Sequence, residues 1–136
     1  MFNVKHQVST PLAQQPIGPF SQAIRSDNRV YISGQIAYNV KTSKLVLNPI
    51  EAQVDQIFNN IKAVAEASGA TLDHIVKINV FITDFKYLSA INSSIEKHFR
   101  YPYPSRTTVQ VASLPMAVDV EIEAILSLTH NDISKL

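Results

Sequence analysis

The sequence contains no cysteine, only three glycines and few charged residues. Without cysteine, the chain can form neither a disulfide nor a cysteine-based zinc site, and it has no thiolate nucleophile. Charged residues make up 17% of the 136 residues, and 12 basic against 11 acidic side chains give a net charge of +1. No two of the basic residues are adjacent, whereas a basic nucleic-acid-binding surface needs clustered cations to neutralise phosphates. We therefore expect no nucleic acid as a partner.

Long apolar runs and metal-binding patterns are also missing. No segment of 18 or more apolar residues occurs, so we expect no membrane span. The first 16 residues have neither the apolar core of a signal peptide nor an Arg-rich pattern, which favours a cytoplasmic protein. The histidines lack i, i+4 pairing and other metal-ligand spacing, and no phosphate-binding glycine loop is present. We expect His98, near a helix end, simply to suit the helix dipole.

The 46% of hydrophobic residues suits one packed domain over 1–136. Alternating apolar and polar residues or turn residues predict strands within 2–8, 20–36 (interrupted by a turn at 26–28), 76–83, 107–111 and 118–129, with a hairpin turn at 41–44.

Two segments have helical periodicity. In the first, Asn48 is the expected N-cap, Pro49 the first helical residue and Glu51 the third residue of a capping-box-like start. Gly69 is expected to end this helix in the left-handed conformation. Asp84 is the expected cap near the second helix, and the YPYP loop at 101–104 stops it. The apolar stripes are Val54, Ile57, Phe58, Ile61, Val64 and Ala65 in the first helix, and Leu88, Ile91, Ile95 and Phe99 in the second.

The order of elements predicts an α+β fold in which two helices cover one face of the sheet. The other face carries Tyr31, Phe81 and Ile125 among its polar residues. Because this face is too apolar to be left in water, we expect a second chain to cover it.

Arg106 and a pair of glutamates are the candidates for chemistry. Arg106 follows a loop stiffened by Pro102 and Pro104, so its planar guanidinium is suited to a two-pronged grip on a carboxylate; the alternative is an ordinary surface arginine at a strand end. Glu121 and Glu123 share one face of the last strand, where a carboxylate can orient or deprotonate water. The alternative is a solvated strand face with cationic partners.

Ser33 and Gly34 lie within a predicted strand. A glycine at such a position lets a ligand approach the backbone closely, and a β-bulge is an equal alternative.

Several stretches in order along the chain resemble the Rid family, the reactive intermediate deaminases, also called the YjgF or translation-inhibitor-protein family. They are IGPFSQAI (17–24), VYISGQIA (30–37), NIKAVAEASGATLDHIVKINVFITD (60–84) and YPSRTTVQVASLPMAVDVEIEAI (103–125). The resemblance runs from about residue 4 to residue 128, so that 129–136 is a short C-terminal extension. It implies a chorismate-mutase-like two-layer sandwich with a mixed sheet, assembled as a homotrimer with the sheets facing inward.

The resemblance also implies a site in the cleft between neighbouring subunits, with no metal and no cofactor. Arg106 corresponds to the arginine that grips the substrate carboxylate, and Glu121 to the glutamate that positions the attacking water. Ser33, Gly34 and Asn92 match pocket residues. The sequence departs from the family at two positions, with Phe20 in place of the usual tyrosine and Thr108 where several members carry cysteine.

The implied activity is hydrolysis of enamine and imine intermediates, such as 2-aminoacrylate and 2-iminobutanoate, to 2-oxo acids and ammonia. Orientation by one arginine and one carboxylate suffices in principle, because a protonated imine is already reactive. The alternative from another class is a non-catalytic trimer that binds a small carboxylate and regulates or protects a partner protein. A ribonuclease is disfavoured, because the sequence offers no His/His or His/Lys acid–base pair and no attractive field for phosphates.

Overall fold

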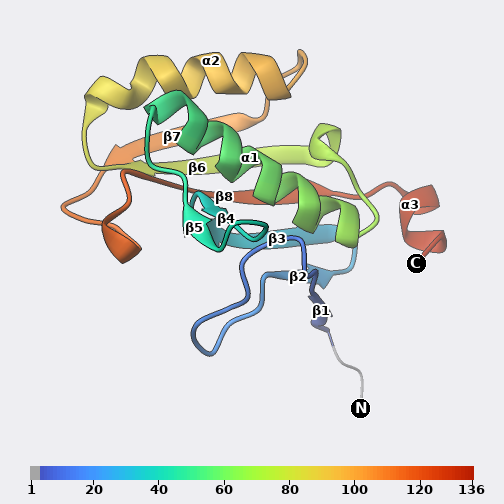
Figure 1. Ribbon diagram of the computed structural model, residues 1–136. Helices are drawn as coiled ribbons and strands as arrows, with labels where there is room; N and C mark the ends of the chain where they lie inside the picture. Colours follow the sequence, from blue (N-terminus) through green and yellow to red (C-terminus); the bar gives the residue numbers. More distant parts are fainter. Residues whose placement is uncertain (1–3) are drawn as a thin grey trace.

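The computed structural model describes residues 4–136 and contains one six-stranded mixed sheet (Figure 1). The strand order is β1-β2-β3-β8-β6-β7, and all neighbours are antiparallel except the parallel pair β6–β7. A separate small hairpin joins β4 and β5. The strands are β1 (His6–Val8), β2 (Ala23–Ser26), β3 (Arg29–Gln35), β4 (Tyr38–Asn39), β5 (Lys44–Leu45), β6 (Ile75–Ile82), β7 (Ser105–Gln110) and β8 (Val120–Ser127).

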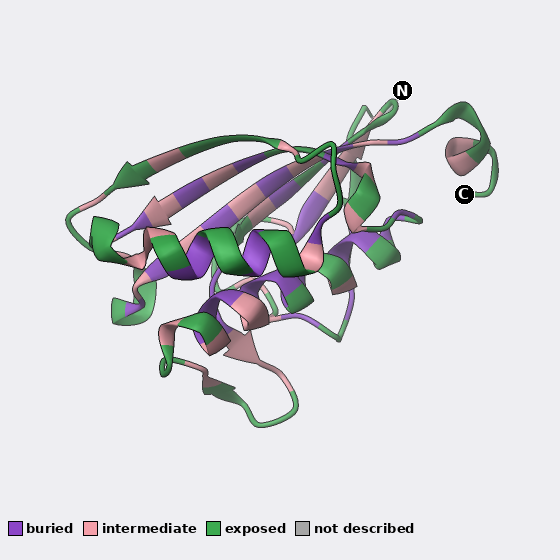
Figure 2. Ribbon diagram, turned by 90° about the horizontal axis from the view of Figure 1, so that it is seen from above, coloured by how far each residue is buried: buried purple, intermediate pink, exposed green. Residues whose placement is uncertain are grey.

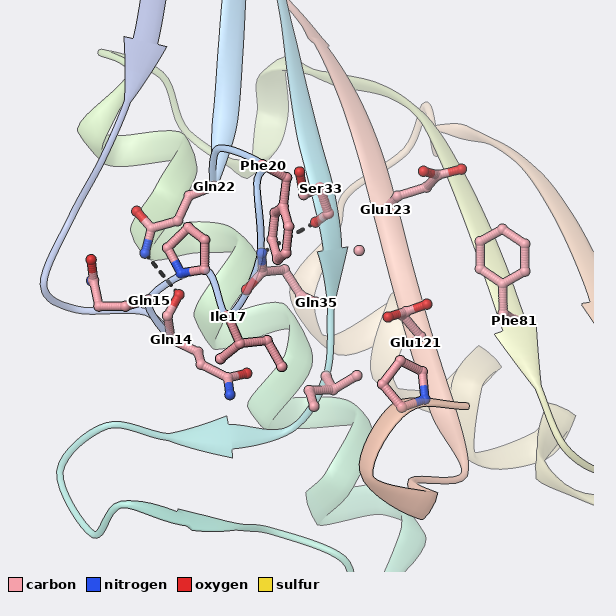
Figure 3. Close-up of a pocket in the computed structure, with 14 residues that line it drawn as sticks. Gln14, Gln15, Ile17, Phe20, Gln22, Ser33, Gln35, Phe81, Glu121 and Glu123 are labelled. Atoms are coloured by element: carbon pink, nitrogen blue, oxygen red, sulfur yellow. Dashed lines mark hydrogen bonds between the residues drawn. The ribbon is translucent and has the colours of Figure 1, made fainter. Parts of the chain in front are cut away.

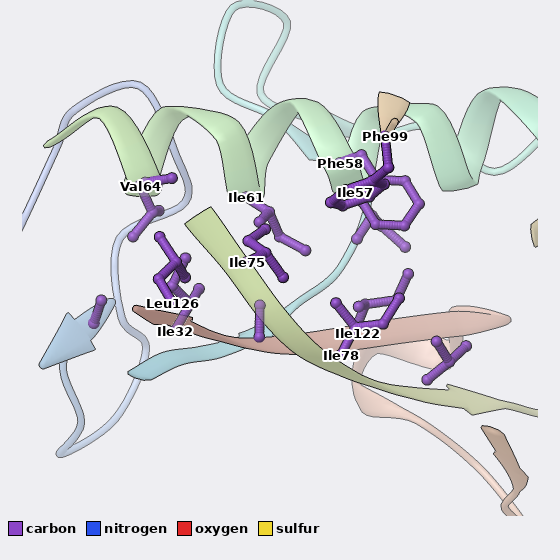
Figure 4. Packing of buried hydrophobic residues seen from close by; sticks show 14 of the residues in the cluster. Ile32, Ile57, Phe58, Ile61, Val64, Ile75, Ile78, Phe99, Ile122 and Leu126 are labelled. Carbon is purple, nitrogen blue, oxygen red and sulfur yellow. The ribbon is translucent and has the colours of Figure 1, made fainter. Parts of the chain in front are cut away.

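Helices α1 (Ile50–Ala67) and α2 (Leu88–His98) cover one face of this sheet, as the sequence predicted (Figure 1). The predicted apolar stripe of α1 is buried against the alternate apolar residues of β3, β6 and β8 (Figure 4). Phe58 of α1 meets Phe99 edge to face, with ring centroids 5.3 Å apart, so the chain leaving α2 is tied to α1. Within residues 4–136, no helix is long and apolar enough to cross a membrane.

The start of α1 differs from the prediction, while its end confirms it. Pro49 has an extended ψ of 167° and is itself the N-cap, so Asn48 lies outside the helix and no side chain caps it. The Pro49 carbonyl instead accepts from the amides of Ala52 and Gln53. At the other end Gly69 has φ 86°, in the left-handed region, as predicted.

The chain ends also differ in part from the prediction. Of the first predicted strand, 6–8 forms β1, and residues 2 and 3 lie outside the described residues. The last strand ends at Ser127, because Thr129 caps a short helix, α3 (His130–Ser134). Asp132 of α3 contacts His74 Nε2 at 3.0 Å. The 129–136 extension is therefore anchored to the turn that precedes β6.

The face of the sheet opposite the helices is open and carries the apolar side chains that the sequence placed there. Tyr31 is 47% exposed, and Phe81 and Ile125 are half-buried. Val109 of the edge strand β7 adds a fourth, 39% exposed. Figure 2 shows the alternation that results, with buried and more exposed residues following each other along the central strands.

Candidate functional site

A cavity of about 510 Å³ lies on the open face of the sheet, between β3, β8 and the loop that precedes β2. The loop that forms one wall of this cavity is held by the buried side chain of Gln22. The Gln22 side-chain oxygen accepts from the amide of Thr10 at 2.7 Å, and its amide nitrogen donates to the carbonyl of Gln14 at 2.9 Å. Because one buried side chain satisfies backbone groups across this turn, the irregular loop holds a defined shape against the sheet.

Ser33 and Gly34 form the opposite wall, where β3 is bulged. The pairing of β3 with β8 shifts register between Ile32 and Gln35, so the bulge interpretation is correct. The hydroxyl of Ser33 donates to the carbonyl of Ser21 at 2.7 Å and ties β3 to the loop. The space above Gly34 is taken by Glu121, since a Cβ at Gly34 would lie 2.9 Å from Glu121 Cδ. The glycine therefore permits close approach of a protein carboxylate to the backbone.

Glu121 and Glu123 both line this cavity from β8, with Phe20 on the loop across from them, and the Glu123 side chain is turned toward β6 (Figure 3). Partial burial raises the pKa of the Glu121 carboxyl, and the neighbouring charge of Glu123 raises it further. Glu123 accepts a hydrogen bond from Asn79 of β6 at 3.0 Å. This side of the cavity therefore presents one carboxyl with an increased affinity for protons and a second, anchored carboxylate.

Arg106 lies elsewhere, on the edge strand β7 and on the helix side of the sheet. It is exposed, and its Nη1 donates to Asn92 Oδ1 of α2 at 2.6 Å. Both residues line a depression of about 290 Å³ together with Tyr103. Asn92 thus holds the guanidinium. The hydroxyl of Thr108, two residues further along β7, is buried without a hydrogen-bond partner within residues 4–136.

The seven residues expected to form one site thus divide into two groups within the chain. Phe20, Ser33, Gly34 and Glu121 line the open-face cavity. Arg106 is level with the core residue Ile78 in the parallel β6–β7 pair, so the Arg106 side chain points to the helix side, away from the face that carries Glu121. One chain alone does not bring the guanidinium and the carboxylate together.

Several lining residues were not found from the sequence. They are Gln14, Gln15, Pro16, Ile17, Gln22, Gln35, Ile36, Phe81 and Pro115. Most belong to loops or to the bulge, where no periodicity indicates which way a side chain points. The period-2 spacing that put the two glutamates on one strand face, and Phe81 on the open face, was the signal of this kind that the sequence contained.

This arrangement of sheet, helices and cavity is that of a known class of small proteins. The family model described as Endoribonuclease L-PSP matches residues 10–127. The chain therefore belongs to this family, the YjgF/Rid family.

The comparisons with individual proteins agree with this membership. A protein of Dermatophagoides farinae named 2-iminobutanoate/2-iminopropanoate deaminase is 51% identical over 122 residues, covering 90% of this chain and 95% of the relative. The crystal structure of RidA from an Antarctic Psychrobacter is 41% identical, with a TM-score of 0.87 and coverage of 90% and 99%. E. coli TdcF with bound serine is 34% identical, with a TM-score of 0.85 and coverage of 92% and 100%.

Proposed function

We propose that this protein hydrolyses imines of small 2-oxo acids, such as 2-iminobutanoate, to the 2-oxo acid and ammonia, without a cofactor. The observation that carries the proposal is Glu121, a partly buried carboxyl of raised pKa that projects over Gly34 into an open cavity. The similarity to a relative named as such a deaminase supports the substrate class. A raised pKa suits a group that accepts a proton from water near neutral pH.

The carboxylate of the substrate requires a cation, and within residues 4–136 none lines the Glu121 cavity. Arg106 is the candidate, and it lies on the opposite side of its own sheet. We propose that it reaches the cavity of a neighbouring copy of the chain in a homotrimer. The exposed apolar side chains of the open face, Tyr31 and Val109 among them, support a second copy as the cover, since this face is costly to leave in water.

In such a cleft the chemistry needs little beyond orientation. Arg106 of one subunit holds the carboxylate with two parallel hydrogen bonds, which fixes the adjacent imine carbon. Glu121 of the other subunit orients a water molecule toward that carbon and accepts its proton as the carbon–oxygen bond forms. Ammonia then leaves, and the carbonyl of the 2-oxo acid remains. Correct placement of two reactants is worth a large part of such a barrier.

The activity is tested by generating 2-iminobutanoate from threonine with a dehydratase and measuring 2-oxobutanoate formation with and without the protein. We expect faster formation than in the uncatalysed control. Tight binding of a 2-oxo acid without acceleration would refute the deaminase and indicate a carboxylate-binding protein instead.

The shared cleft is tested by mixing two inactive variants, Arg106→Ala and Glu121→Gln, after joint unfolding and refolding. A cleft built from two chains restores activity, because some clefts then receive both native residues. In a randomly mixed cyclic trimer about one cleft in four is intact, so we expect about a quarter of the native rate. No recovery in mixed trimers would show that both residues act within one chain.

A further inference from the structure

Glu123 lies in the Glu121 cavity but is held differently from Glu121. The two residues are two positions apart on β8 and project from the same face into the same cavity. Glu123 is directly opposite Asn79 in the β6–β8 ladder, and the Asn79 amide donates to Glu123 Oε1 at 3.0 Å. Within residues 4–136, Glu121, opposite Phe81, has no such donor, and it lies against the backbone at Gly34. One carboxylate is therefore anchored, and the other faces the space that a substrate occupies.

The hydrolysis proposed above requires one group to accept a proton in its first step and to donate a proton in its second. First, the water oxygen bonds to the imine carbon, its proton goes to a carboxylate, and the C=N π electrons move to nitrogen. Next, the same group returns the proton to the amine nitrogen, the C–N bond breaks, and its electron pair leaves with ammonia. The remaining hydroxyl gives its proton back to the same carboxylate as the carbonyl forms, and the carboxylate then releases it to solvent. A carboxyl with an ordinary proton affinity is poorly matched to the base role near neutral pH.

We infer that Glu123, anchored by Asn79, is a positioning residue for this reaction, because its fixed negative charge adapts Glu121 to both transfers. The inference rests on the proposed function. Two carboxylates in one cavity cannot both be ionised without cost, and the charge of Glu123 adds to burial in raising the pKa of Glu121. Asn79 distinguishes the two carboxyl groups, since its hydrogen bond holds Glu123 in place while Glu121 remains directed into the cavity.

The other charged groups on this face lie further along the strands. Lys77 is level with Ile125, two residues beyond Glu123 and four beyond Glu121, so along the strands it is closer to Glu123 than to Glu121. Arg29 is opposite Ser127 and donates to the Ser127 hydroxyl at 2.9 Å. The side chains that face this side from β3, β6 and β7 are Arg29, Tyr31, Ser33, Lys77, Asn79, Phe81, Thr107 and Val109.

The test compares the native protein with Glu123→Gln, which keeps the shape and removes the charge. The titration midpoint of Glu121 is followed by its side-chain carboxyl carbon-13 NMR signal, assigned by its loss in Glu121→Gln. The pH profile of kcat is measured in parallel. We expect both the midpoint and the acidic limb of the profile to move to lower pH in Glu123→Gln, because the repelling charge is gone. A merely structural role for Glu123 would lower the rate without moving either.

Glu66→Gln is the matched control, since it removes the same charge from an exposed position on α1, on the other side of the sheet. It should leave the Glu121 midpoint in place, and an equal movement there would overturn the inference. If Glu123→Gln fails to fold, Glu123→Thr tests the same expectation with a residue that suits strands. The NMR titration needs no turnover. An inactive native protein would therefore overturn the proposed function, whereas an unmoved midpoint would overturn the role of Glu123.

Discussion

Gly34→Ala is expected to change the position of the Glu121 side chain, and with it the rate, while changing the stability of the fold little. A Cβ at this position would lie 2.9 Å from Glu121 Cδ and 3.1 Å from both Cγ and Oε1. Gly34 is not in the left-handed region, so alanine causes no backbone strain. The crowded atoms belong to the end of a flexible side chain, and Glu121 rather than the backbone must move. An off-rotamer side chain costs about 0.5–1.5 kcal/mol, so the free energy of unfolding should change little.

The effect on catalysis should be much larger than the effect on stability. A reacting group displaced by roughly 1 Å can cost on the order of 100-fold in rate, because the bound geometry no longer resembles the transition state. We therefore expect kcat/KM for 2-iminobutanoate hydrolysis to fall by about 10-fold to 100-fold, with a melting temperature within about 5 °C of the native one.

Gly18→Ala is the control for this substitution, because a Cβ there would lie 3.6 Å from the nearest atoms of Phe20, an ordinary contact. It should leave both the rate and the melting temperature close to native values. Native turnover in Gly34→Ala would refute the reasoning, since the Glu121 carboxylate would then not need its observed position.

Three further predictions concern the arginine and the two helices. Arg106→Lys should lower kcat/KM about tenfold to hundredfold without changing the oligomer seen by light scattering, because lysine keeps the charge and loses the two-pronged grip; an unchanged rate would remove Arg106 from the mechanism. Gln53→Leu should lower the free energy of unfolding in urea by at least about 2 kcal/mol, because Gln53 is fully buried and its side-chain oxygen accepts from the amides of Asp119 and Val120. Burial opposes ionisation of Asp55, but hydrogen bonds from Lys97, Ser94 and His98 outweigh burial and lower the pKa of this carboxyl below 3.8. These hydrogen bonds therefore stabilise the folded state above pH 3.8, and this stabilisation is lost as the pH falls through the lowered pKa of the folded state. The difference in unfolding free energy between the native protein and Asp55→Asn should therefore be constant at neutral pH and narrow as the pH falls below about 3.8; a difference independent of pH would contradict it.

Local patterns in the sequence predicted the structure correctly where the surroundings of a residue depend on its near neighbours in the chain. The period-2 strands and the 3.6-residue stripe of α1 were predicted correctly, since burying one face requires those spacings whatever the partner. Gly69 was predicted for a similar reason, because a left-handed helix end favours a residue without Cβ. The α1 cap was wrong because Pro49 satisfies the φ of either the cap or the first turn, and only its ψ decides between them.

His98 illustrates a contact that crosses between elements. The sequence placed it at a helix end, and its prediction considered only the dipole of its own helix. The structure places its Nε2 3.1 Å from Asp55 Oδ1, and Ser94 of the same helix donates to that carboxylate at 2.7 Å. The two helices are joined here by a polar cluster between residues about forty positions apart. No local pattern encodes such a pairing, because it depends on how the helices cross.

The sequence by itself determined the family, the order of the main strands and of the two long helices, and the residue types available for chemistry, because these depend on spacing and composition. Only the tertiary structure decided where those residues point. The parallel β6–β7 register turns Arg106 toward α2, and the β3 bulge opens the backbone at Gly34 to Glu121. A shift of one residue in either register would exchange the two faces of a strand, and register is set by the packing of the whole sheet against its helices.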